Sequence, residues 1–99
     1  MSHQATLKPS SGTVMVRYWA AARAAAGVEC DRLDVAGDTT LAVVLDEVRS
    51  LHRDRPRLHD VIAVCSVLVG YRPVGTTDPA SVVLRPGDVV ELLPPFAGG

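Results

Sequence analysis

The chain has 99 residues, of which 47% are hydrophobic and 21% are charged, and this composition is typical of one globular domain rather than of a disordered chain. The formal net charge is −1 at pH 7, so no excess of basic residues points to a nucleic-acid partner. No apolar run approaches the roughly 20 residues that a membrane-spanning helix needs. The first residues also lack the pattern of a secretory signal, and we therefore expect a cytoplasmic protein.

The N-terminal part predicts a flexible leader followed by a strand. Residues 1–12 are polar and are expected to be the leader. The β-branched and aromatic residues of 13–19 predict a strand whose even-numbered positions face the core. Arg17 indicates that the opposite face meets water. Trp19 on that face either covers the neighbouring helix or belongs to an exposed apolar patch.

The next segment predicts a short helix and a second strand. The alanine-rich residues 20–26 strongly favour a helix, and Gly27 is a natural residue to end it. Because such a short helix is unstable alone, it must pack on the sheet. In residues 28–35, Leu33 and Val35 alternate with polar residues, which predicts a half-buried edge strand.

The central part predicts the main helix. Residues 37–40 offer a turn and an N-cap, and the apolar spacing that follows predicts a helix over 40–52. Pro56 predicts the start of a second, shorter helix. His52 and His59 flank an Arg- and Asp-rich stretch, which we interpret as a solvated helix end. These histidines and the cysteines lack metal-ligand spacing, so we expect no metal site.

The C-terminal part returns to strands and turns. Residues 66–70 and 89–93 predict strands, and 71–74 predict a short strand after a turn. Residues 81–84 predict a strand fragment or a tight turn, and 85–88 predict a turn. The whole order predicts an α+β fold of the β-grasp kind, in which a mixed sheet wraps over one main helix.

The two cysteines, Cys30 and Cys65, are too few and too far apart for a disulfide framework. We interpret them as reduced, mostly buried thiols. A redox or sulfur-relay role for Cys65 is the alternative, and no neighbouring residue supports it.

The last six residues carry the strongest chemical signal. They read Pro94-Pro95-Phe96-Ala97-Gly98-Gly99. The two prolines favour an extended backbone, so we expect residues 94–99 to project as a semi-stiff tail from a domain spanning 13–93. Glycine has no Cβ, so the end of the tail fits a narrow slot. Its carboxylate is ionised at pH 7 and needs activation, for which adenylation by ATP is the obvious route. The reacting group would then be the main chain at Gly99.

Three segments resemble the MoaD/ThiS family of ubiquitin-like sulfur carriers. They are residues 14–27, with an opening strand, an aromatic pair and an Arg-bearing helix; residues 37–51, with the main helix; and residues 86–99, with the last strand and the tail. The double proline before the tail is most like the MoaD branch, the small subunits of molybdopterin synthase. Gly70 stands where relatives often have Asn, and Cys65 is not a general feature of the family.

The resemblance implies a specific activity. Gly99 would be adenylated by a ubiquitin-activating-type adenylyltransferase that consumes ATP, and converted to a thiocarboxylate with sulfur from a donor such as a cysteine desulfurase or a rhodanese. Phe96, Ala97 and Gly98 would insert with it into the large subunit, MoaE, where two carriers supply the two dithiolene sulfurs for cyclic pyranopterin monophosphate. The chain would bind no cofactor and would not be catalytic alone.

The resemblance also implies that Trp19, Arg23 and Leu93 contact the partner. In the last strand, Glu91 and Leu93 share one face, so Leu93 and Trp19 are expected to form an apolar patch beside the tail. Three other functions use the same sequence features. They are a ubiquitin-like modifier joined to lysines through Gly99, a sulfur carrier for thiamine or cysteine synthesis, and a passive β-grasp interaction domain.

Overall fold

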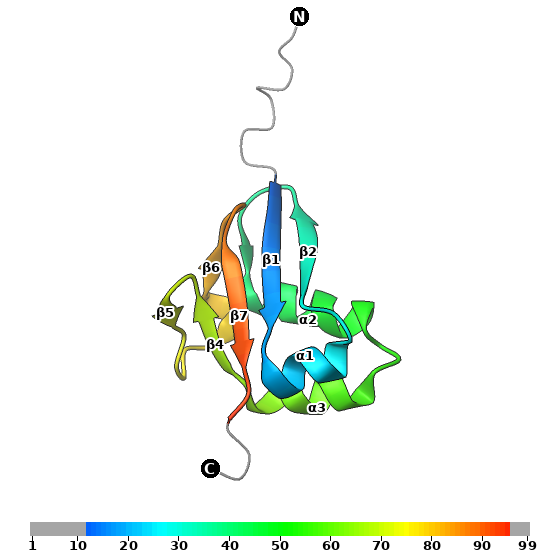
Figure 1. Cartoon of the computed structure of the whole chain (residues 1–99). Coiled ribbons are helices and arrows are strands. Elements are labelled where there is room, and N and C mark those ends of the chain that lie inside the picture. The colour runs from blue at the N-terminus through cyan, green and yellow to red at the C-terminus, as the bar shows by residue number, and fades with distance from the viewer. Residues whose placement is uncertain (1–11, 96–99) are drawn as a thin grey trace, which may run out of the picture.

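The computed structural model describes residues 12–95, which form a five-stranded mixed sheet with helices packed against it (Figure 1). The strand order is β2-β1-β7-β4-β5. β1 is parallel to β7 and antiparallel to β2, and β4 is antiparallel to both β7 and β5. The bounds are β1 Gly12–Tyr18, β2 Cys30–Val35, β4 Ser66–Val69, β5 Arg72–Pro73 and β7 Val89–Leu93. This is the α+β, β-grasp fold of ubiquitin-like proteins, as the sequence predicts.

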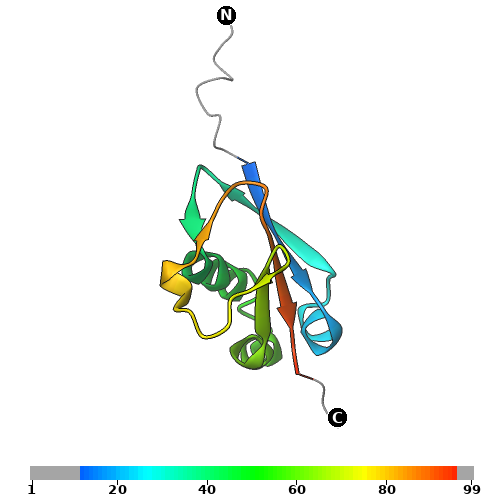
Figure 2. The same cartoon turned by 90° about the vertical axis from the view of Figure 1, so that its left-hand side faces the viewer.

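The helices and a second, two-stranded sheet complete the fold. Their bounds are α1 Ala20–Ala26, α2 Leu41–Leu51, α3 Pro56–Val64, the 3₁₀-helix η2 Pro79–Ser81, β3 Thr39–Thr40 and β6 Val83–Leu84. Figure 2 shows α2 lying across one side of the sheet. Both views place α1 and α3 at the end of the sheet where β1 and β7 finish.

The core lies between the inner face of the sheet and α2. Val14, Val16 and Tyr18 are at most 2% exposed, which confirms the inward face that the alternation of β1 predicts. The buried residues of α2 are Leu41, Val44, Leu45 and Val48. Thr40 begins this helix as the sequence predicts, because its side-chain oxygen accepts a hydrogen bond from the backbone N–H of Val43 at 3.3 Å.

Several boundaries differ from those predicted. β1 begins at Gly12, inside the expected leader, and β2 begins at Cys30 rather than at Val28. Residues 39–40, predicted as a turn and a cap, also form β3, because β6 supplies a partner strand. A pairing between segments this far apart along the chain has no local signature in the sequence.

Four of the described glycines have a positive φ, and two of them stand where an element ends or turns. Gly27 ends α1 with φ of +78°, and a Cβ there would lie 2.9 Å from Nη2 of Arg55. Gly70 has φ of +63° and is the first residue of the two-residue loop between β4 and β5. That is the position at which type II′ hairpins need glycine, so the departure from the family pattern at Gly70 fits its turn.

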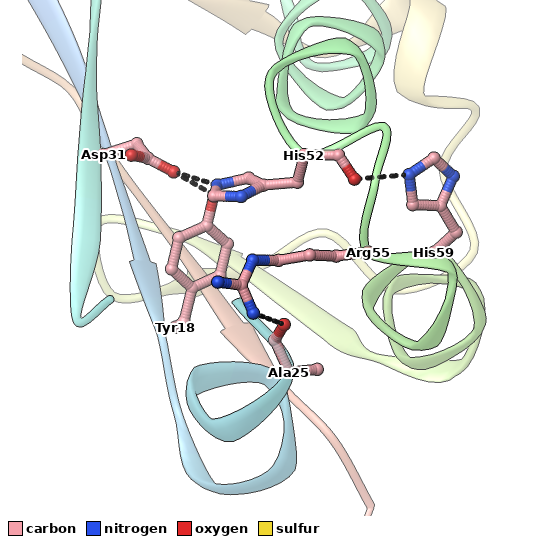
Figure 3. Close-up of polar contacts among 6 residues, drawn as sticks. All are labelled: Tyr18, Ala25, Asp31, His52, Arg55 and His59. Carbon is pink, nitrogen blue, oxygen red and sulfur yellow. Dashed lines mark hydrogen bonds and ion pairs between the residues drawn. The ribbon is translucent and has the colours of Figure 1, made fainter. Parts of the chain in front are cut away.

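The interpretation of His52 as part of a solvated helix end is wrong. Its side chain is 11% exposed, and its Nε2 lies 2.7 Å from a carboxylate oxygen of Asp31. The same oxygen accepts a hydrogen bond from the hydroxyl of Tyr18 at 2.7 Å. Figure 3 shows these three side chains meeting between the sheet and the end of α2. The His52 carbonyl in turn accepts a hydrogen bond from Nε2 of His59 at 3.1 Å, so both histidines fasten helix ends to the core.

Candidate functional site

The surface from which the tail departs is built by the ends of β1 and β7 and by α1. The parallel register pairs Tyr18 with Leu92, and the backbone N–H of Trp19 donates to the Leu92 carbonyl at 3.2 Å. Trp19 therefore lies level with Leu93, the last residue of β7. Ala20 then takes φ of +49°, a left-handed conformation that is strained for any residue with a Cβ. This strained residue turns the chain from β1 directly into α1.

Two polar contacts hold the Trp19 ring on the outer face of the sheet. Its Nε1–H donates to a carboxylate oxygen of Glu91 at 2.7 Å. The guanidinium carbon of Arg17 lies 4.9 Å from the centre of the ring, within the range of a cation–π contact. Trp19 remains 37% exposed, as expected for a residue on the wet face of β1. The role of Glu91 had no signal in the sequence, because 72 positions separate it from Trp19.

Arg23 and Leu93 lie differently around Trp19. Arg23 projects from α1 and pairs with Glu29 at 2.8 Å, and both side chains are exposed. Leu93 is half-buried. Trp19 and Arg23 belong to one hollow of about 200 Å³, the Trp19 hollow. It is lined by Met15, Arg17, Tyr18, Trp19, Arg23, Glu29 and Cys30. Leu93 is on the neighbouring strand and does not line it.

The Trp19 hollow suits recognition rather than chemistry. Its walls combine an aromatic ring with arginines and a glutamate, and tryptophan and arginine are the residues most often found at the energetic centre of protein interfaces. Pro94 is half-buried and Pro95 is exposed at the start of the tail. The expected tail residues Phe96, Ala97, Gly98 and Gly99 lie outside the described residues.

The two cysteines are free, and both are half-buried. The expectation that they are mostly buried is therefore wrong in degree. Burial raises the pKa of the Cys65 thiol to about 11. A thiol with this pKa is protonated at neutral pH, so it is a poor nucleophile for a sulfur relay.

Within residues 12–95, no three side chains of His, Cys, Asp or Glu are grouped so that they could hold a metal ion. None of the described helices has both the length and the apolar character needed to cross a membrane.

A model of the ThiS family matches residues 16–99. The chain belongs to the ThiS family. The matched region contains β7, residues 94–99 and every residue that lines the Trp19 hollow except Met15. The chain is therefore a ubiquitin-like small protein of the ThiS/MoaD type, either a sulfur carrier or a protein modifier. A search among curated proteins finds no significant match.

Several solved structures share the fold of this ThiS-family chain. The HVO 2177 protein of Haloferax volcanii is 28% identical, with a TM-score of 0.68 over 91% of this chain and 89% of that protein. The small archaeal modifier protein SAMP1 of the same organism is 25% identical, with a TM-score of 0.69 over 89% of this chain and 100% of SAMP1. A chain in the Helicobacter pylori complex of subunits 1 and 2 of molybdopterin-converting factor is 24% identical. Its TM-score is 0.57 over 88% of this chain and 99% of that one.

Proposed function

We propose that this ThiS-family chain is a sulfur carrier of the MoaD type, the small subunit of a molybdopterin synthase, and that it reacts through Gly99. The observation that carries the proposal is the family match through the final two glycines, which are separated by four residues from the end of β7, the strand that pairs in parallel with β1. The alternating core residues explain the fold, but they do not explain a Pro-Pro-Phe-Ala-Gly-Gly sequence after β7. A tail that enters the active sites of other proteins would explain this sequence.

The chemistry needs no side chain of this protein. The Gly99 carboxylate attacks the α-phosphorus of ATP on an adenylyltransferase, which forms a mixed acyl–phosphate anhydride and releases pyrophosphate. A cysteine persulfide on a cysteine desulfurase or a rhodanese then attacks the acyl carbon with its outer sulfur and displaces AMP, which gives an acyl disulfide with the donor. A second thiol attacks the donor's sulfur, forms a disulfide with it and releases the thiocarboxylate. Glycine at positions 98 and 99 keeps the approach to that carbon free of side chains.

The Trp19 hollow would be the surface that the partner contacts. Trp19 and Arg23 would contact the large subunit, MoaE, and Leu93 would extend the contact along β7. The tail residues Phe96, Ala97 and Gly98 would carry Gly99 into the partner's active site. The Helicobacter pylori structure is a complex of two such subunits, which supports this arrangement. ATP serves the activating enzyme, and this chain binds no cofactor of its own.

A ubiquitin-like protein modifier is the second candidate. The identity of 25% with SAMP1, a protein named as a modifier, favours it. In that case the activated Gly99 carbonyl would be attacked by a lysine amine of another protein, with formation of an isopeptide bond. The chain itself has one lysine, Lys8, and its other nine basic residues are arginines. Self-conjugation through a lysine would therefore have a single acceptor.

The test of the sulfur-carrier proposal uses purified thiocarboxylated protein. Mixed with MoaE and cyclic pyranopterin monophosphate, it is expected to yield molybdopterin while its own mass returns to that of the carboxylate. The carboxylate form serves as the matched control and is expected to yield none. Failure of the thiocarboxylate form to transfer sulfur to this acceptor, with transfer to a thiazole synthase instead, would contradict the molybdopterin assignment.

A further inference from the structure

A second hollow lies apart from the Trp19 hollow. It lies between β2 and α2, has a volume of about 640 Å³, and we call it the β2–α2 groove. It is lined by Leu33, Val43, Asp46, Glu47, Ser50, Leu51 and Arg53. None of these residues lines the Trp19 hollow, although Cys30 at the start of β2 does.

Leu33 brings β2 to the groove, and β2 is an edge strand of the sheet. β2 pairs with β1, and no other strand of residues 12–95 pairs with its free side (Figure 1). The backbone N–H of Tyr18 donates to the Glu29 carbonyl at 2.9 Å. Hydrogen-bonded and non-bonded pairs alternate along an antiparallel ladder. The backbone N–H and C=O groups of Cys30, Arg32 and Asp34 therefore point away from β1, toward an additional strand.

The outer side of α2 also lines the groove and combines apolar and acidic residues. Val43 is 49% exposed and Leu51 is 56% exposed, and Leu33 forms the floor from β2. Glu47 is exposed between these apolar residues. Asp46 beside it is bonded to Arg49 at 3.2 Å, so Glu47 is the acidic group better able to attract a cation from a ligand.

We propose that the β2–α2 groove binds an extended segment of a partner protein by adding a strand to β2. This segment carries alternating apolar side chains that cover Leu33, Val43 and Leu51, and a lysine or arginine that meets Glu47. The free backbone groups provide affinity for an extended main chain, and the apolar floor selects alternate side chains. A second copy of this chain fits the groove less well. A symmetric pairing of two β2 strands would place Asp46 and Glu47 of one copy on the same side of the joined sheet as Asp46 and Glu47 of the other, so like charges would face one another.

The experiment uses the full chain and a defined probe. The probe is a short synthetic peptide in which valine and threonine alternate between two terminal lysines. Binding is followed by two-dimensional NMR of the ¹⁵N-labelled protein. We expect shifts at Cys30, Arg32, Asp34, Val43 and Glu47, and slower hydrogen exchange of the edge-facing amides. A peptide that is N-methylated at alternate amides is the control for strand addition and is expected not to bind.

A charge exchange then tests the identity of the occupant. Glu47→Lys is expected to weaken binding of the lysine peptide by about 2- to 5-fold and to strengthen binding of the same peptide with terminal glutamates. Asp60→Lys on α3, which is also exposed and lies outside the groove, is the matched control and is expected to change neither affinity. Shifts confined to other surfaces, or equal binding of the N-methylated peptide, would overturn the proposal. Concentration-dependent shifts at the same amides without any peptide would show that a second copy is the occupant.

Discussion

The contact between His52 and Asp31 lends itself to a quantitative test, because sequence and structure disagree about it. Replacing His52 with Ala removes a hydrogen bond to a carboxylate whose side chain is only 18% exposed. A hydrogen bond to a charged group contributes about 1.5–3 kcal/mol. The His52 ring also meets the Tyr18 ring edge-on, with centroids 5.9 Å apart, and such a pair contributes about 0.5–1.5 kcal/mol. We expect His52→Ala to lower the free energy of unfolding by about 2–4.5 kcal/mol.

The assay is urea denaturation followed by circular dichroism. His52→Phe separates the two contributions, because it keeps an aromatic ring beside Tyr18 but cannot bond to Asp31. Arg49→Ala is the matched control. It removes an exposed pair with Asp46 at 3.2 Å, whose loss is expected to cost no more than about 0.5 kcal/mol. If His52→Ala is no more destabilising than Arg49→Ala, His52 is a solvated helix-end residue after all and the buried network does not hold α2.

Four further predictions concern the tail, the partner surface and the titrating groups. Gly98→Val is expected to leave the unfolding midpoint unchanged but to block activation of Gly99, because the added branch obstructs the slot; adenylation by the activating enzyme at the rate of the unmodified chain would refute the steric reasoning. Trp19→Ala is expected to weaken MoaE binding by about 2 kcal/mol or more in calorimetry, with a smaller loss of stability; the opposite pattern would make Trp19 a structural residue. Iodoacetamide at pH 8 is expected to modify Cys65 about 100-fold more slowly than an ordinary thiol, and comparably fast labelling of it would contradict the raised pKa. Burial, reinforced by the hydrogen bond to Asp31, raises the pKa of Tyr18 above its ordinary value of 10. The folded state then keeps a proton that the unfolded chain releases, so stability is expected to fall as the pH rises above about 10, and a flat denaturation midpoint from pH 9 to pH 11 would be the contrary result.

Elements governed by local periodicity could be predicted from the sequence. The alternation of Val14, Val16 and Tyr18 identified the inner face of β1, and the left-handed Gly27 ends α1 where the alanine-rich run stops. Thr40 caps α2 through a contact three residues ahead. Each of these features depends on neighbours within one or two turns, where backbone geometry limits the choices.

Contacts between distant segments could not be predicted in this way. His52 meets Asp31 because α2 ends beneath β2, and Trp19 meets Glu91 because β1 and β7 are parallel. The Arg- and Asp-rich sequence around His52 favoured a solvated helix end, and no local pattern outweighed it. In the candidate site, the exposure of Trp19 was predictable from the position of Arg17 on the same face. The contacts of its ring with Arg17 and Glu91 were not predictable.

In the proposed function the carboxyl group of Gly99 is the reacting group, and the folded domain is the surface that the activating enzyme and the large subunit bind. The most direct test of this function is the intact mass of the chain after co-expression with its activating enzyme and a sulfur donor, beside a variant that lacks Gly99. We predict a gain of about 16 Da, one oxygen replaced by sulfur, in the full chain and none in the shortened one. An unchanged mass for the full chain, together with branched Gly-Gly remnants on lysines of other proteins, would contradict the sulfur-carrier account.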